Sequence, residues 1–209
     1  MQEPPAAPAA AMDPGRLEAF SDGVFAIAVT LLILDVRVAD EGDSLAQRLG
    51  HAWPSYAAYV ISFIVIGTMW INHHRMFKAL VAVDHTIIVA NLALLLVISF
   101  IPFPTKLLGE HLTSGTFADE RTAVLVYGAT MMVVGIVFPA LWWSIVRDRA
   151  LLRPYVTPEI AHAELRRNLV GFPTYTLVTA VAVVAPKVSL AGFGALALFY
   201  LLPGRRSQG

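Results

Sequence analysis

Long apolar runs separated by short polar stretches dominate the sequence, and their length is typical of helices that cross a membrane. A transmembrane helix needs roughly 20 mostly apolar residues, because the hydrocarbon core of a bilayer is about 30 Å thick. Six segments follow this pattern: 17–36, 54–77, 86–108, 121–145, 165–185 and 188–202. The pattern predicts an all-α polytopic membrane protein with six transmembrane helices per subunit.

Proline positions refine these segments. Pro54 suits the first turn of the second helix, where its missing N–H costs nothing. Pro102 and Pro104 predict a distortion at the far end of the third helix, and Pro139 predicts a kink in the fourth. Residues 44–51, between the first two segments, are weakly amphipathic and predict a turn or a short helix.

The sixth segment is shorter than a full span. Lys187 and Arg205 at its two ends extend it, because long basic side chains reach toward the headgroups. Pro186 and Lys187 leave room only for a tight hairpin between the last two segments. Several glycines inside the segments permit close helix approach: Gly67, Gly128, Gly135, Gly171, Gly192 and Gly194.

Composition agrees with a membrane protein and narrows the possible partners. Hydrophobic residues make up 57% of the 209 residues and charged residues only 14%, against roughly 25% in soluble domains. The 15 basic and 15 acidic residues give a net charge of zero, so no overall charge favours nucleic acid as a partner. The chain has no cysteine, which excludes disulfides and thiolate metal sites.

The two ends and the loops predict the domain limits and the topology. Residues 1–15, rich in Pro and Ala, predict a disordered tail; residues 16–203 form the transmembrane domain, and 204–209 are a short basic tail. With a cytoplasmic N-terminus, the cytoplasmic side holds ten basic residues and the other side five, so both termini are expected in the cytoplasm. The ten are Arg16, Arg75, Lys78, Arg147, Arg149, Arg153, Arg166, Arg167, Arg205 and Arg206.

The first apolar helix has one aliphatic face. At 100° per residue, Ile27, Leu31 and Leu34 point the same way, and Thr30 lies beside them. Arg16, Phe20 and Gly23 extend this face toward the start of the helix. Side chains at this spacing usually serve packing or lipid contact, and a face that lines a pore is the functional alternative.

Asp22 stands next to the uncharged part of the same helix, although an ionisable group at such a position is costly. It points roughly 140° away from the aliphatic face, so we expect it to face the other helices of its own subunit. The alternative without a functional role is an aspartate at the membrane interface, near the helix N-terminus, where the helix dipole favours a negative charge. Its possible partners are His73 or His74, with Arg16 and Arg75 as competitors.

Further polar side chains lie at the end of the second helix and inside the third. His73 and His74 point about 100° apart, so they do not form a metal clamp, and we expect no metal site. One of them is expected to face inward and bind an acid. Asn91 is expected to bond across helices.

No enzyme signature is present. The sequence lacks a nucleophile elbow, a phosphate-binding loop and a dinucleotide fingerprint, so an enzyme has no positive support. A proton- or cation-coupled transporter, with Asp22 and His73 as a proton relay, is the alternative to a channel. It is weakened by the aliphatic middle of the first helix.

Three motifs together resemble the transmembrane protein 175 family, which comprises lysosomal and prokaryotic potassium channels. They are Arg16-x-x-x-Phe20-Ser21-Asp22, residues 70–75 (WINHHR) and residues 99–105 (SFIPFPT). The resemblance extends over all six segments in order. A single copy of the first motif is similar to the prokaryotic members, which are tetramers in the cell membrane.

The resemblance implies a potassium-preferring cation channel, with lipid and permeant K⁺ as partners and no cofactor. In that family the first helices of the subunits line a central pore with a hydrophobic constriction. Counted along the sequence from the first-helix motif, the resemblance places the constriction at Ile27. Leu31 and Leu34 are then the next layers, with Thr30 beside them. The motif network then comprises Arg16, Phe20, Ser21, Asp22, Trp70, His73, His74 and Asn91.

Overall fold

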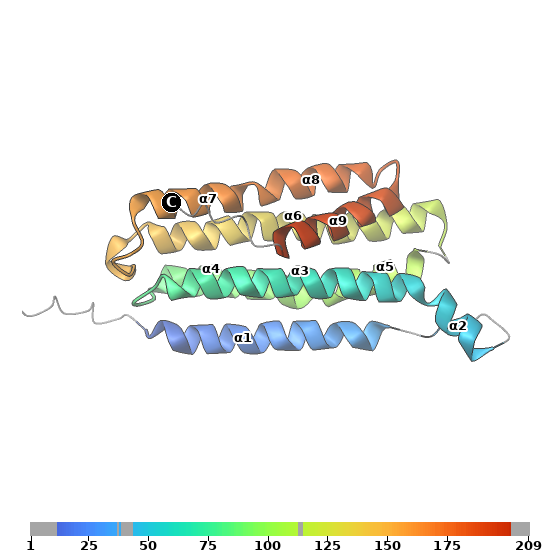
Figure 1. Cartoon of the computed structure of the whole chain (residues 1–209), viewed down its shortest axis with the longest axis horizontal. Helices are drawn as coiled ribbons and strands as arrows, with labels where there is room; N and C mark the ends of the chain where they lie inside the picture. Colours follow the sequence, from blue (N-terminus) through green and yellow to red (C-terminus); the bar gives the residue numbers. More distant parts are fainter. Residues whose placement is uncertain (1–11, 37, 39–43, 113–114, 202–209) are drawn as a thin grey trace, which may run out of the picture.

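A computed structural model describes residues 12–36, 38, 44–112 and 115–201. The regular secondary-structure elements within these residues are helices (Figure 1). Backbone pairing outside the helices is limited there to two isolated bridges. The elements are α1 (Pro14–Leu31), η1 (Leu32–Asp35), α2 (Leu45–His51), α3 (Trp53–Lys78), α4 (His85–Phe100), α5 (Pro102–His111), α6 (Phe117–Val146), η2 (Arg149–Leu151), α7 (Pro158–Leu169), α8 (Gly171–Val181) and α9 (Pro186–Leu201).

The long helices run side by side along the longest axis of the molecule (Figure 1). Helix α1 lies at one edge and packs on α3 and α4, while α7 and α8 lie at the opposite edge and pack on α6. Helix α9 folds back from α8 and contacts α3, α6 and α8. One side of α1 therefore has no neighbouring helix among the described residues.

Within the part of the chain that the structure describes, four helical stretches are long and apolar enough to cross a membrane: Pro14–Asp35, Trp53–Lys78, His85–His111 and Phe117–Val146. These correspond to the first four predicted segments. Among the described residues α9 is a shorter apolar helix, and α8 ends at Val181. The helical fold is thus confirmed, with four helical stretches of membrane-crossing length and apolarity among the described residues.

Two of the predicted segments are divided near a proline. The third segment divides at Ile101, where α4 ends and Pro102 begins α5, so the predicted distortion is confirmed. The fifth segment was expected to be one helix, and this is wrong, because it divides at Val170 into α7 and α8. Pro173 has no N–H to bond the carbonyl of Leu169 and its ring crowds that carbonyl, which accounts for the break.

Backbone pairing joins three segments at the end of the bundle where α1 begins. Met12 pairs with Val83, and Leu80 pairs with Leu152. Asp13 caps α1, because its side chain accepts a hydrogen bond from the N–H of Gly15. Residues 1–11 of the expected disordered tail lie outside the described residues, whereas 12–15 belong to the folded structure.

An ion pair at the same end connects the first half of the bundle to the second. Asp84 accepts the N–H of Ile87 at 2.8 Å and so caps α4, and it also binds Arg147 after α6. Partial burial of Asp84 raises its pKa, but the N–H of Ile87 and the Arg147 guanidinium outweigh this effect. The pKa of Asp84 therefore lies below its ordinary value.

Candidate pore helix and its supporting network

Helix α1 has two faces of opposite character. Its rear face buries Leu17, Ser21, Phe25 and Ala28 against α3 and α4. Its front face, continued by η1, carries the predicted aliphatic side chains, with exposed fractions of 61% for Ile27 and 41% for Leu31 on α1 and 70% for Leu34 on η1. Thr30, Phe20, Gly23 and Arg16 are also exposed.

A chain of hydrogen bonds holds the rear face of α1 against α3 and α4. The backbone carbonyl at one end of this chain determines which group donates in each bond. The Leu17 carbonyl can only accept, so Ser21 Oγ donates to it at 2.8 Å. Ser21 Oγ in turn accepts from Asn91 Nδ2 at 2.9 Å. This leaves Asn91 Oδ1 toward His73 Nε2 at 2.8 Å, so the imidazole donates from Nε2. The chain links α3 through α4 to α1.

Aromatic rings enclose the histidine in this chain. His73 is fully buried, and its ring stacks on Phe77 with centroids 4.3 Å apart. The ring of Phe25 on α1 approaches it at 5.3 Å. Its Nδ1 has no hydrogen-bond partner among the described residues. An apolar, low-dielectric cage strengthens the hydrogen bond of the histidine and fixes its ring.

Among the described residues, Asp22 hydrogen-bonds neither a histidine nor an arginine, contrary to the sequence-based expectation. Its carboxylate accepts the indole N–H of Trp70 at 2.8 Å. His74 instead pairs with Glu18 on α1 at 2.5 Å, and its ring stacks on Trp70. The reason is geometric, since Trp70 lies one helical turn before His74 and reaches the next turn of α1.

One of the two histidines does face inward, as expected, but its partner is an amide rather than an acid. Asp22 and His73 bind different partners, and no hydrogen bond joins them in the described part of the chain. A direct hydrogen bond for the proton relay of the alternative hypothesis is therefore not among the contacts of these described residues.

The motif residues are thus brought together only in part. Ser21, Asn91 and His73 form one connected chain, and Asp22, Trp70 and His74 form an adjacent cluster with Glu18. Arg16 and Phe20 lie on exposed parts of α1, outside the buried chain.

Sequence reasoning missed two features. Glu18 was not assigned a partner, although its spacing of four residues from Asp22 places both acids on the side of α1 that meets α3. A second buried polar cluster was missed as well: Ser62 Oγ donates to Tyr127 at 3.3 Å and lies 2.8 Å from Thr105 Oγ1. It joins α3, α5 and α6.

No group of three or more metal-ligating side chains of the His, Cys, Asp or Glu type occurs among the described residues. The site is instead an exposed apolar face on a helix that polar bonds hold from behind. Such a face requires a neighbour outside the chain, which is either lipid or further copies of the protein.

Comparison with known proteins identifies the family. Residues 16–102, from the first turn of α1 to the first residue of α5, match the family described as "Endosomal/lysosomal potassium channel TMEM175". A potassium channel of Streptomyces collinus is 45% identical over 188 residues, which cover 89% of this chain and 90% of that protein. The chain belongs to the TMEM175 family.

Solved structures and animal relatives agree with this membership. The crystal structure of a homolog of the lysosomal potassium-selective channel TMEM175 from Chamaesiphon minutus has a TM-score of 0.80 and 35% identity. The alignment covers 90% of this chain and 95% of that one. The endosomal/lysosomal proton channel TMEM175 of Gallus gallus is 32% identical over 151 residues, which are 30% of its length.

TMEM175 membership decides the class of the protein. The family consists of ion channels and not of enzymes, in agreement with the absence of an enzyme signature. The resemblance of the three motifs to the transmembrane protein 175 family is confirmed. The matched range contains α1, α3 and α4, which are the helices that the Ser21–Asn91–His73 chain connects.

Proposed function

We propose that this protein is a potassium-preferring channel of the cell membrane, with six spans per subunit and both termini in the cytoplasm. Four copies surround a central pore lined by the front face of α1. The exposure of Ile27, Leu31 and Leu34 on a helix whose rear face is fixed is the observation that carries this proposal. The potassium channels of Streptomyces and Chamaesiphon, alike over nine-tenths of the chain, supply the choice of ion.

The constriction lies at Ile27, where four branched side chains meet at the axis. Such a ring has no oxygen ligands, unlike a filter of backbone carbonyls. A cation that passes it must shed part of its hydration shell. Because K⁺ is larger than Na⁺ and holds water less strongly, the ring favours K⁺ by a modest factor. The same ring closes the pore when water leaves it.

Thr30 lies one turn beyond the constriction. Its hydroxyl donates to the Ile27 carbonyl at 2.9 Å, so its oxygen lone pairs remain available toward the exposed face. Four such oxygens hold water next to the ring and rehydrate the ion there. Leu31 and Leu34 then form the following apolar layers.

The rear network sets the rotation of α1. A rotation that withdraws Ile27 from the axis breaks the contacts of Ser21 with Asn91 and of Asp22 with Trp70. Since buried polar groups are costly when unpaired, the network favours one rotational position of α1. The motif residues Ser21, Asp22, Trp70, His73, His74 and Asn91 therefore position the pore helix and do not contact the ion.

An ion-flux assay tests this proposal. Purified wild-type protein in liposomes is compared with Ile27→Asn, and Ile136→Asn on α6 serves as a matched control at an isoleucine that is 52% exposed. The asparagine side chains at position 27 supply oxygen ligands and widen the constriction. The potassium-to-sodium permeability ratio should therefore fall toward one. The control should retain the wild-type ratio. An unchanged ratio in Ile27→Asn would remove Ile27 from the filter.

A further inference from the structure

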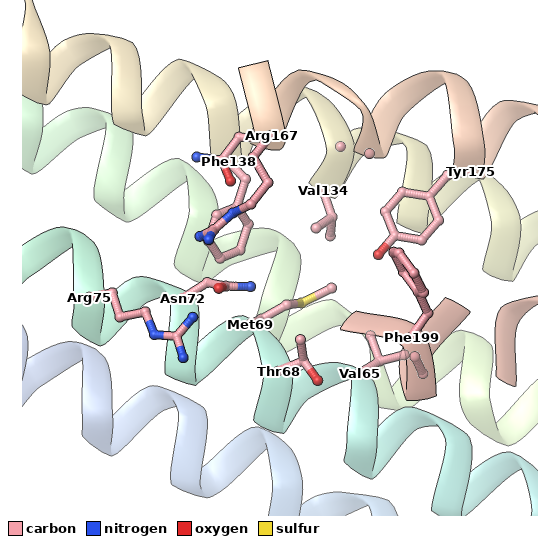
Figure 2. Close-up of a pocket in the computed structure, with 14 residues that line it drawn as sticks. Val65, Thr68, Met69, Asn72, Arg75, Val134, Phe138, Arg167, Tyr175 and Phe199 are labelled. Carbon is pink, nitrogen blue, oxygen red and sulfur yellow. The ribbon is translucent and has the colours of Figure 1, made fainter. Parts of the chain in front are cut away.

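A cavity of about 430 Å³ lies on the side of α3 that faces away from α1 (Figure 2). Its walls come from α3, α6, the break between α7 and α8, and α9. Helix α1 contributes no lining residue, so the cavity is separate from the front face of α1. The volume falls within the roughly 300–1,000 Å³ of small-molecule sites.

The cavity is polar at one end and apolar at the other. Figure 2 shows Asn72, Arg75 and Arg167 together at one end, and Tyr175 and Phe199 at the opposite end. Between them the wall is apolar and deeply buried, with Val65, Met69, Val134 and Phe138 each at most 8% exposed. This gradient matches a molecule with a polar head and an apolar chain.

Two buried polar atoms of the cavity wall have no hydrogen-bond partner among the described residues: Thr68 Oγ1 and Asn168 Nδ2. Thr68 is only 7% exposed, and its hydroxyl does not bond to a carbonyl of its own helix as Thr130 and Thr179 do. Native proteins rarely leave such atoms unpaired, so each needs an explanation. A bound molecule that accepts hydrogen bonds supplies one.

The charges at the polar end favour a negatively charged ligand. Arg75 on α3 has no acidic partner in the part of the chain that the structure describes. Arg167 pairs with Glu164 on its own helix at 2.6 Å, which leaves further guanidinium N–H groups. Asn72, Asn168 and Thr68 add neutral donors. Hydrogen-bond donors therefore outnumber acceptors at the polar end of the cavity. Glu164 is the one carboxylate among the described residues at this end.

We propose that this cavity binds an anionic membrane lipid. Its headgroup contacts Arg75 and Arg167, and one acyl chain runs past Met69 and Val134 toward Phe199. Basic pockets between transmembrane helices are known to hold anionic headgroups in this way. The bound chain fills the space between α3 and the α8–α9 hairpin, so the lipid stabilises the packing of that hairpin.

The chain's own C-terminal segment is a poor occupant. Residues 202–209, which lie outside the described residues, contain Arg205 and Arg206 and no acidic side chain. Two arginines repel the arginines of the cavity, whereas a phosphate diester binds them. Charge complementarity therefore favours a lipid.

Lipid binding to the full-length purified protein tests the proposal. Native mass spectrometry and thermal unfolding are measured in mild detergent with phosphatidylglycerol, with phosphatidylcholine of the same chains, and with inorganic phosphate. The variants are Arg75→Gln and Arg167→Gln. Arg166→Gln, the neighbouring arginine of α7 that does not line the cavity, is the matched control.

We expect phosphatidylglycerol to bind the protein and to raise its unfolding temperature. Phosphatidylcholine and inorganic phosphate should bind more weakly and raise the unfolding temperature less. Each cavity variant should weaken binding by about tenfold, the loss typical of one charge-assisted hydrogen bond. Arg166→Gln should bind as the wild type does. Equal binding of both lipids, an equal effect of phosphate alone, or an equal loss in Arg166→Gln would overturn it.

Discussion

Two helix interfaces of this protein are held together in different ways. Helix α1 meets α3 and α4 through directional polar bonds, of which the Ser21–Asn91–His73 chain is fully buried. Helix α6 meets α8 through close packing at two glycines, Gly128 against the side chain of Thr179 and Gly135 against the backbone of Gly171 and Phe172. A Cβ at Gly128 would lie 2.4 Å from Thr179 Oγ1, and one at Gly135 would lie 2.9 Å from the backbone N of Phe172.

The difference follows from what each interface must fix. Hydrogen bonds fix the rotation of a helix, because they fail when donor and acceptor turn away from each other. Shape contacts between small residues fix the distance between helices and are made by van der Waals packing. The pore helix of our proposal needs a defined rotation, whereas α8 only needs a close neighbour.

The largest effect is expected when the close interface is widened. Gly135→Ala forces backbone apart, since its Cβ meets the Cα and N of Phe172 at 2.9 Å. We expect a loss of up to about 3 kcal/mol in unfolding free energy, the upper range for overpacking. Reversible unfolding in mixed detergent micelles measures it. Gly67→Ala is the control, because nothing lies within 4 Å of its Cβ, and it should not destabilise. Equal stability of the two variants would contradict the close-packing account.

A smaller loss is expected when the polar interface is cut. Asn91→Leu leaves the N–H of buried His73 without an acceptor, which costs roughly 2 kcal/mol. Ser99→Ala on the same helix removes an exposed hydroxyl that donates to the Leu96 carbonyl of its own helix, and it should be nearly neutral. The polar account further predicts that Asn91→Leu reduces ion flux more than Gly135→Ala does at matched amounts of folded protein. The reverse order would contradict it.

The smallest effect concerns the ion pair that joins the two halves of the bundle. Asp84→Asn should cost about 0.5 kcal/mol at pH 7, because Asp84 and Arg147 are partly exposed. The folded state lowers the pKa of Asp84, so its contribution is fully present above the ordinary value of 3.8. It is lost as the pH falls through the lowered pKa. The stability difference between wild type and variant should therefore vanish in acid, and a difference that grows in acid would be inconsistent with the pair.

The sequence was sufficient for the helical fold and for the aliphatic face of α1, because both follow from helical periodicity over long apolar runs. It also singled out Asn91 and the two histidines as polar groups that need partners. It did not assign those partners correctly. The indole N–H of Trp70 competes for Asp22, and which donor wins depends on the relative axial position of α1 and α3.

The break in the fifth segment and the two close contacts of α6 are tertiary features. In the sequence, Pro173 was a signal for the break. The apolar run of the fifth segment continues past Pro173, however, so hydropathy alone predicts one helix. Gly128 and Gly135 were recognised as small residues, yet their partners on α8 depend on how the helices align. The cavity behind α3 could not be predicted at all, because its lining comes from four parts of the chain.

The central claim is that the front face of α1 meets its copies around water, and a single cysteine tests it most directly. The natural chain has no cysteine, so Ile27→Cys introduces the only thiol. In liposomes a charged thiol reagent should block ion flux through this variant, and oxidation should join subunits in pairs. Ile136→Cys should show neither effect. An Ile27→Cys protein that reacts with lipid-soluble but not with charged reagents, and does not cross-link, would contradict the account.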